Sequence, residues 1–275
     1  MAKTKHPKPA KIASGWSDFR AAIALFREHW QLYSLLILSV SIPSDLIGMS
    51  STFSADATLG TVVQVAALFM NLAVLWAVIQ HIEGKKVTFG QAFYDGTAAM
   101  LRFILIGLTL VGLLIFAAIG VFIYEISVQS IYAPPPTSPE QLLIGFVCAL
   151  LALPSIFLIT RFGLAYIGVV HDNLRPIAAL RRSWRLTRGR FWRVLGHGAQ
   201  LLVYMAIVAI PPSLLAAALG LLKAGGWATF VFELCISVLA LPIGNTYLVR
   251  FYRHLKQTAP DQFMNPTPQT DLFDD

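Results

Sequence analysis

Seven arginines lie between Arg175 and Arg193, in the segment RPIAALRRSWRLTRGRFWR, and a long apolar run follows directly. A guanidinium group presents planar hydrogen-bond donors that match a phosphate group, so the segment predicts binding of an anion. Nucleic acid and the anionic surface of a membrane both offer phosphate at high density. The residues around the arginines decide between these two partners.

Helical periodicity places the apolar residues of this segment together. Ile177, Leu180 and Trp184 share one side of a helical wheel, and basic residues occupy the neighbouring sector. This arrangement is typical of a helix that lies in the headgroup layer of a membrane. Nucleic acid would leave the apolar side uncovered, so we expect no nucleic-acid partner. The residues expected to bind anionic headgroups are Arg181, Arg182, Arg185 and Arg188, with Trp184 as the anchor.

A second set of polar side chains falls inside apolar segments. A charged residue within a bilayer costs about 2.5–3.5 kcal/mol on insertion scales, which makes it a functional candidate. One hypothesis is a polar path for a transported solute or proton. The other, which we favour, is hydrogen bonding between helices, with Arg161 reaching toward the headgroups. The five residues are Gln64, Asn71, Arg161, Glu233 and Asn245.

Metal binding and catalysis have little support in the sequence. His81, His171 and His254 stand at equivalent ends of three predicted spans and form a weak candidate for a metal site. No closely spaced ligand motif accompanies them, so we expect neither a metal nor another cofactor. The motifs G-x-S-x-G and H-E-x-x-H, the Walker loop and the dinucleotide fingerprint are all absent from the sequence. We therefore expect a protein without enzymatic activity.

The composition indicates a membrane environment. Of 275 residues, 56% are hydrophobic and 13% are charged, and the mean hydropathy is +0.67. Soluble domains carry about 25% charged residues, so this chain lacks the polar residues that would cover a soluble core. Cys148 and Cys235 both lie in apolar runs and predict neither a disulfide framework nor a metal motif.

Six segments have the length of about 20 apolar residues that a membrane-spanning helix needs. With six spans, 20 of the 21 Lys and Arg residues fall on one side, and only Lys223 falls on the other. Basic residues concentrate on the cytoplasmic side, so both termini are predicted to be cytoplasmic and the loops near Ser54, Pro135 and Lys223 to face outward. Segment 213–222 is either a surface helix or an extension of the fifth span. The predicted spans are 31–49, 60–82, 103–124, 141–170, 192–211 and 227–250.

Three stretches, beginning at Asp18, Phe89 and Leu180, share apolar positions at intervals of four and seven residues. Each leads into a span, an outward loop and a returning span, and Thr88 with Gln91 has the spacing of a capping box. The sequence therefore predicts an all-α integral membrane fold with three repeats of an interfacial amphipathic helix and a transmembrane hairpin. Such patterning can also arise because any cytoplasmic connection rests at the interface. The predicted parts are a disordered basic tail 1–16, a six-span domain 17–256 with repeats 17–87, 88–175 and 176–256, and a disordered tail 257–275.

A family resemblance rests on three features of the sequence. They are Arg161, the string P-x-x-A-L-R-R-S-W-x-L-T-x-G-x-F/W from Pro176 to Trp192, and the ending YLVRFYRHLK from Tyr247. They resemble the bacterial membrane domain of glycerophosphoryl diester phosphodiesterases, related to the YciC-like and DUF975 groups of uncharacterised integral membrane proteins. The resemblance covers about residues 155–256. It implies a multi-pass protein of the bacterial inner membrane. It does not imply phosphodiesterase activity, because enzymes of that family carry the activity in a separate soluble domain, for which this chain has no room.

We therefore expect a non-enzymatic, multi-pass inner-membrane protein with both termini in the cytoplasm. Its function would depend on anionic lipid, or on a membrane or cytoplasmic protein partner, bound at the arginine-rich interfacial helix. The alternative is a transporter or channel for a small solute or lipid, with a polar path through the helix bundle. Such a path requires a continuous cavity lined by Asn71, Arg161 and Glu233.

Overall fold

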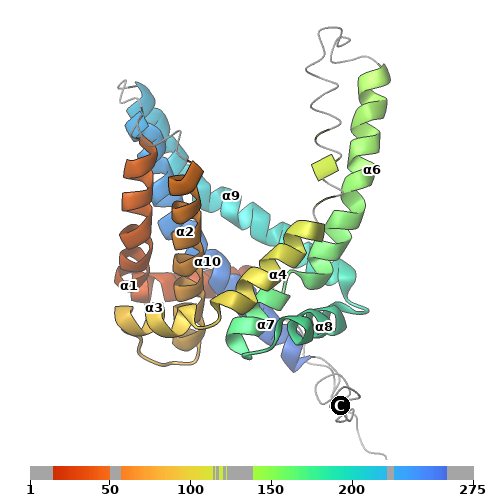
Figure 1. Cartoon of the computed structure of the whole chain (residues 1–275), viewed down its shortest axis with the longest axis horizontal. Helices are drawn as coiled ribbons and strands as arrows, with labels where there is room; N and C mark the ends of the chain where they lie inside the picture. The colour runs from red at the N-terminus through yellow and green to blue at the C-terminus, as the bar shows by residue number, and fades with distance from the viewer. Residues whose placement is uncertain are drawn as a thin grey trace, which may run out of the picture. The chain divides into compact units, whose positions relative to one another are not determined.

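A computed structural model describes residues 15–49, 57–113, 115, 118–119, 122, 139–221 and 226–258. Within these residues every regular element is an α-helix, as the sequence predicts (Figure 1). The predicted outward loops near Ser54, Pro135 and Lys223 lie outside the described residues, as do the tails before residue 15 and after residue 258. The helices are α1 (Gly15–Met49), α2 (Ala57–Ile82), α3 (Phe89–Thr97), α4 (Met100–Leu113), α6 (Pro139–Phe162), α7 (Ala165–His171), α8 (Pro176–Thr187), α9 (Phe191–Leu221) and α10 (Gly226–Gln257).

The helices form two compact units. Unit 1 comprises residues 1–100 and 196–275, and unit 2 comprises residues 101–195. Unit 1 thus contains α1, α2, α3, α10 and most of α9. Unit 2 contains nearly all of α4, the helices α6, α7 and α8, and the first turn of α9.

The core of unit 1 lies where α1, α2 and α10 pack on one another. Each helix contributes buried apolar side chains, such as Leu36 from α1, Leu75 from α2 and Phe251 from α10. A further cluster joins α1 to α9, where the rings of Phe19 and Tyr204 stack with their centres 4.4 Å apart. Lipid tails are as apolar as these side chains, so close van der Waals packing is what favours helix association in a membrane.

Helix α3 is a short amphipathic helix held at both ends. Thr88 Oγ1 accepts a hydrogen bond from the Gln91 N–H, and Gln91 Oε1 accepts one from the Thr88 N–H, which confirms the predicted capping box. At the other end Gly96 lies against α2, where a Cβ atom on residue 96 would come within 2.8 Å of Ala73 Cα. Glycine at this position lets the two helix backbones approach closely.

Helix α1 contains a break. His29 has φ −119° and ψ 21°, outside the helical region, so residues 15–28 and the residues after His29 form two helical segments. The predicted first span, 31–49, begins directly after this break. The N-terminal boundary differs slightly from the prediction, because Gly15 and Trp16 form the first turn of α1 instead of the end of a disordered tail.

Two other predicted boundaries also differ from the structure. The predicted fourth span, 141–170, is divided, because α6 ends at Phe162 and α7 begins at Ala165. Gly163 ends α6 with its N–H donating to the Ile159 carbonyl oxygen at 2.7 Å, and a Cβ on residue 163 would lie 2.6 Å from that oxygen. In the fifth span, α9 runs through Pro211 and Pro212 to Leu221, so residues 213–221 extend the span and form no separate surface helix.

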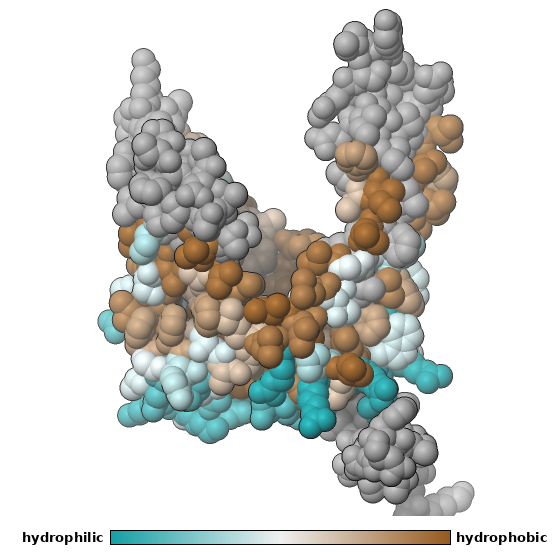
Figure 2. All heavy atoms as spheres, viewed as in Figure 1, coloured by the Kyte–Doolittle hydropathy of each residue, from teal (hydrophilic) through white to brown (hydrophobic). Residues whose placement is uncertain are grey.

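Four helical stretches are long and apolar enough to cross a membrane: Val65–Ile82, Leu153–His171, Phe191–Ala218 and Phe230–Gln257. A fifth results if the bent pair α3 and α4 is counted as one span. Only 6% of the third stretch is buried within the protein. In Figure 2, hydrophobic residues cover the visible lengths of the helices in each unit, and hydrophilic residues gather at the ends that carry α3 in unit 1 and α8 in unit 2. These exposed apolar helices indicate a membrane protein.

Candidate functional site

Helix α8 is the folded form of the arginine-rich segment. Pro176 occupies the first turn, where the N–H that proline lacks would have no partner within the helix. The helix ends at Thr187, and Gly189 turns the chain toward α9 with φ +75°, a conformation that glycine adopts without strain. These local signals place Arg181, Arg182 and Arg185 on a helix of 12 residues, with Arg175 and Arg188 as its caps.

One side of α8 packs against the rest of unit 2. Ser183 Oγ donates a hydrogen bond to the carbonyl oxygen of Arg161 at 2.7 Å and so joins α8 to the end of α6. Helix α7 also packs on α8. The buried residues of α8 are Ala179, Ser183, Leu186 and Thr187.

The opposite side of α8 carries apolar and basic side chains that the protein covers only in part. Ile177 is 67% exposed and Trp184 is 37% exposed. Arg181 and Arg188 are exposed, and Arg185 is half-buried. The side that the sequence assigns to lipid is therefore the side that faces away from the core of unit 2.

An open groove with a volume of about 410 Å³ runs along this exposed side. Its walls are almost entirely apolar, so the aliphatic parts of Arg181 and Arg185, one helical turn apart, line it and leave their guanidinium groups at its edge. An acyl chain can pack on the apolar wall while a phosphate binds the guanidinium groups. The lining residues are Phe162, Ile177, Leu180, Arg181, Trp184 and Arg185.

Arg182 differs from the other three predicted headgroup ligands. Its Nη1 atom lies 3.5 Å from Asp172 Oδ2, and both side chains are largely buried. Asp172 Oδ1 also lies 2.9 Å from His171 Nδ1. Arg182 therefore holds the turn between α7 and α8. Arg181, Arg185 and Arg188 remain as the candidate headgroup ligands.

The same turn is held from α4. Arg102 Nη1 donates to both the backbone oxygen and the side-chain Oδ1 of Asn173, at 3.0 and 2.6 Å. Asn173 has φ +52°, the left-handed region that asparagine tolerates better than most residues. In the sequence Arg102 is only one of the basic residues on the predicted cytoplasmic side, and no local pattern predicts its contact with Asn173.

Arg161 lies in an aromatic cage at the end of α6. Its guanidinium carbon is 4.9 Å from the ring centre of Trp184, 5.2 Å from that of Phe157 and 5.8 Å from that of Phe191. Each such cation–π contact contributes about 0.5–2 kcal/mol, depending on exposure. The structure thus brings together two residues that were predicted to have different functions. Arg161 was a candidate for a polar path, and Trp184 was a candidate for lipid binding. Sequence reasoning missed Phe157 and Phe191 as parts of the site.

Hydrogen bonding satisfies the Arg161 side chain only in part. Its Nη1 atom donates to Thr187 Oγ1 at 3.5 Å, and its buried Nε atom has no hydrogen-bond partner among the described residues. In the part of the chain that the structure describes, Arg161 forms no ion pair with a carboxylate. The contacts around this cation are therefore aromatic rings and one hydroxyl group.

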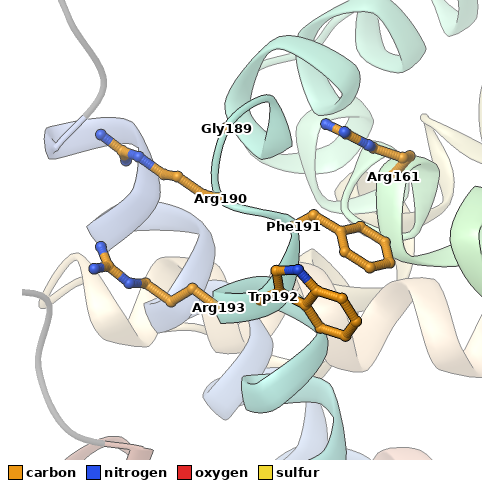
Figure 3. A pocket seen from close by; sticks show the side chains of 6 residues that line it. All are labelled: Arg161, Gly189, Arg190, Phe191, Trp192 and Arg193. Atoms are coloured by element: carbon orange, nitrogen blue, oxygen red, sulfur yellow. The ribbon is translucent and has the colours of Figure 1, made fainter.

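A pocket with a volume of about 690 Å³ opens beside Arg161. Figure 3 shows Arg190 and Arg193 extending in the same direction, with Arg161 on the other side of Phe191. Three of the six lining residues are arginines, and the pocket includes the loop between α8 and α9. The lining residues are Arg161, Gly189, Arg190, Phe191, Trp192 and Arg193.

The other four residues of the predicted polar path belong to unit 1. Asn71 is half-buried on α2, Asn245 is buried on α10 and Glu233 is exposed on α10. Glu233 precedes Asn245 by 12 residues, which is about 18 Å along a helix. The side chain of Gln64 lies outside the described part of the chain. A pocket of about 410 Å³ in unit 1 contains none of the four and is lined by Leu38, Val231, Leu234, Cys235, Val238 and Leu239.

The three candidate metal-binding histidines have other contacts. His81 Nδ1 lies 2.7 Å from the Tyr33 hydroxyl, and its ring stacks on that of His29 with the centres 3.7 Å apart. His171 contacts Asp172, as described above, and His254 contacts Asp18. No group of three or more His, Cys, Asp or Glu residues in the described ranges is arranged to hold a metal ion.

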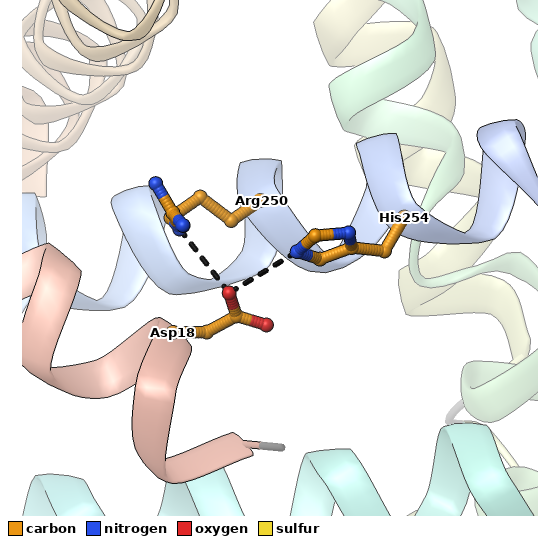
Figure 4. Close-up of polar contacts among 3 residues, drawn as sticks. All are labelled: Asp18, Arg250 and His254. Atoms are coloured by element: carbon orange, nitrogen blue, oxygen red, sulfur yellow. Dashed lines mark hydrogen bonds and ion pairs between the residues drawn. The ribbon is translucent and has the colours of Figure 1, made fainter. Parts of the chain in front are cut away.

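Unit 1 contains an ionic cluster that the sequence analysis missed. Asp18, in the first turn of α1, is fully buried. Its Oδ1 atom lies 3.2 Å from Arg250 Nε and 3.2 Å from His254 Nε2, both on α10 (Figure 4). Its Oδ2 atom is buried without a hydrogen-bond partner among the described residues. The cluster joins the beginning of α1 to the end of α10.

Comparison with known proteins gives one family match. The model of a family described as Domain of unknown function (DUF7847) matches residues 32–255 of the chain. No curated protein and no solved structure matches the chain. None of the comparisons links it to the glycerophosphoryl diester phosphodiesterase membrane domain, which the segment around Pro176–Trp192 resembles.

Proposed function

The chain belongs to the family described as Domain of unknown function (DUF7847), and from its geometry we propose that it is a non-enzymatic, multi-pass membrane protein that binds anionic lipid through α8. The observation that carries this proposal is the exposed side of α8. There, Ile177 is largely exposed and Trp184 partly exposed, beside Arg181, Arg185 and Arg188. Such a surface matches the apolar and charged layers of a membrane interface.

The proposed topology has six spans with both termini in the cytoplasm, in a bacterial inner membrane. The one-sided distribution of Lys and Arg supports this orientation. Three helix breaks support the repeat of an interfacial helix and a span: one at His29 within α1, one between α3 and α4, and one between α8 and α9. In this topology all three interfacial segments, 15–28, α3 and α8, lie at the cytoplasmic face.

Trp184 connects the lipid-facing side of α8 to the rest of unit 2. Its ring lines the open groove and also lies 4.9 Å from the Arg161 guanidinium carbon. The cation limits how far the indole can move, so the anchor is held in place before lipid binds. We propose that an acyl chain packs beside Trp184 while the lipid phosphate binds Arg181 and Arg185. A membrane or cytoplasmic protein that carries acidic residues is the alternative partner for the same surface.

Replacing Arg181 and Arg185 together by glutamine is expected to weaken the retention of anionic lipid about thirtyfold. Each arginine near an anionic leaflet contributes about 1 kcal/mol, and every 1.4 kcal/mol corresponds to a factor of ten. The measurement is native mass spectrometry of protein released from nanodiscs that contain equal amounts of phosphatidylglycerol and phosphatidylcholine. The ratio of the two retained lipids reports the preference for the anionic one.

Two controls make this experiment specific. Lys85→Gln with Lys86→Gln removes the same charge from two exposed positions in the loop between α2 and α3, outside the three interfacial segments, and is expected to leave the lipid ratio almost unchanged. Circular dichroism checks that all variants keep their helix content in the membrane. A lipid ratio that is the same in the Arg181 and Arg185 variant as in the original protein contradicts the proposal. If the ratio stays the same but the variant loses a copurifying protein, the partner is a protein.

A further inference from the structure

We propose that the pocket between Arg161 and the α8–α9 loop is a binding site for a phosphate-bearing dianion. This pocket is distinct from the groove on the exposed side of α8, and its ligand would be bound by different arginines. The inference therefore goes beyond the proposed function, which depends on Arg181 and Arg185. Two observations carry it: the surroundings of Arg161 and the composition of the pocket lining.

The first observation is a cation that has no carboxylate partner within the described part of the chain. A guanidinium group stays protonated in proteins, so Arg161 carries its positive charge in the aromatic cage of Phe157, Trp184 and Phe191. Among the described residues it has one hydrogen bond, to Thr187, and its buried Nε has none. Removing a charge from water is unfavourable unless the charge is paired and hydrogen-bonded. An anion in the adjacent pocket would supply the missing charge and further hydrogen-bond acceptors.

The second observation is the lining of the pocket itself. Three of the six residues that line one open space of about 690 Å³ are arginines: Arg161, Arg190 and Arg193. Protein sites for small ligands have volumes of about 300–1,000 Å³, so the space holds a phosphate together with an attached organic group. Phe191 and Trp192 provide apolar walls for that group. Gly189 adds no side chain to the loop at this point.

The number of cations indicates the class of ligand. Arginine forks bind carboxylate and phosphate groups with similar geometry. A carboxylate carries one negative charge, whereas a phosphate monoester carries about 1.5–2 negative charges at neutral pH. Three arginines in the lining of one pocket therefore favour a phosphate monoester. It can be the headgroup of a lipid such as phosphatidic acid, or a small soluble phosphate compound.

The test is isothermal titration calorimetry with the full-length protein in phosphatidylcholine nanodiscs at constant salt. One arm titrates inorganic phosphate and glycerol 3-phosphate, and the other titrates short-chain phosphatidic acid below its micelle concentration. The variant Arg161→Gln is expected to weaken binding about tenfold to a hundredfold, the loss typical for a hydrogen bond to a charged group. Arg27→Gln, at an exposed arginine of α1 that lines neither the pocket nor the groove, is the matched control and is expected to change the affinity less than about twofold.

The outcomes separate the two sources of phosphate. Arg161-dependent binding in the soluble arm identifies a free phosphate compound, and Arg161-dependent binding only in the lipid arm identifies a headgroup. If Arg161→Gln does not fold, Arg193→Gln, at an exposed residue of the same pocket, replaces it. Absence of binding in both arms overturns the inference, and so does binding that the pocket variants leave unchanged. Arg181→Gln with Arg185→Gln distinguishes this site from the proposed function, because it should reduce lipid retention and preserve phosphate binding.

Discussion

Replacing Arg250 by methionine is expected to lower the free energy of unfolding by about 3 kcal/mol. The substitution leaves the carboxylate of Asp18 buried, with His254 as its one remaining ion-pair partner among the described residues. Removing one partner of a buried ion pair costs about 3–5 kcal/mol, because the remaining charge is left uncompensated. The lower end applies here, since 36% of the Arg250 side chain is exposed and water screens the interaction.

A second substitution tests whether the unpaired charge is the cause. Asp18→Asn in the Arg250→Met background removes that charge and is expected to restore most of the lost free energy. Reversible denaturation in detergent micelles measures both variants, and Arg253→Met on the same helix is the matched control for the loss of one arginine. A deficit that persists after Asp18→Asn would show that the charge of Asp18 is not responsible. A loss of equal size in Arg253→Met would also contradict the explanation.

Replacing Gly96 by leucine is expected to destabilise unit 1 by about 3 kcal/mol, at the upper end of the range for overpacking substitutions. A Cβ at this position would lie 2.8 Å from Ala73 Cα and 3.2 Å from the Leu72 carbonyl oxygen, both backbone atoms of α2. Backbone atoms within a helix cannot move aside independently, so α3 must move away from α2. The loss is measured by the same denaturation experiment.

Gly90, on the same helix, provides the control for this prediction. Nothing lies within 4 Å of the position that its Cβ would take, so Gly90→Leu adds the same side chain without a clash. It is expected to be neutral or slightly stabilising, because glycine is about 1 kcal/mol less favourable than alanine in a helix and leucine is nearly as favourable as alanine. Equal destabilisation by the two leucine substitutions would mean that the contact between α3 and α2 is not what Gly96 provides.

The features that the sequence predicts correctly are those that depend on neighbouring residues. Thr88 and Gln91 form a capping box because their spacing of three residues matches the geometry of the first helical turn. Pro176 begins α8 for a similarly local reason. The exposed side of α8 follows from the helical periodicity of Ile177 and Trp184, of which the folded protein leaves the first largely and the second partly exposed.

The contacts that the sequence does not predict join residues far apart in the chain. Asp18 and His254 are 236 positions apart, and no local pattern distinguishes them from solvent-exposed charges. The aromatic cage of Arg161 forms because α8 packs back onto α6. At this contact Ser183 hydrogen-bonds to Arg161, which precedes it by 22 positions in the sequence. Arg182 has the same residue type as its neighbour Arg181, and only the position of Asp172 in the folded turn separates their roles.

The depth of α8 in the membrane tests the central claim most directly. A nitroxide label at Ile177→Cys, in a protein with Cys148→Ala and Cys235→Ala, is placed in phosphatidylglycerol vesicles, and its collisions with oxygen and with a water-soluble nickel chelate are measured. The claim predicts that residue 177 lies in the headgroup layer, with more oxygen and less nickel contact than a label at Lys86→Cys, an exposed position in the loop between α2 and α3. Equal nickel contact at residues 177 and 86 would contradict the claim, because α8 would then lie in water and not on lipid.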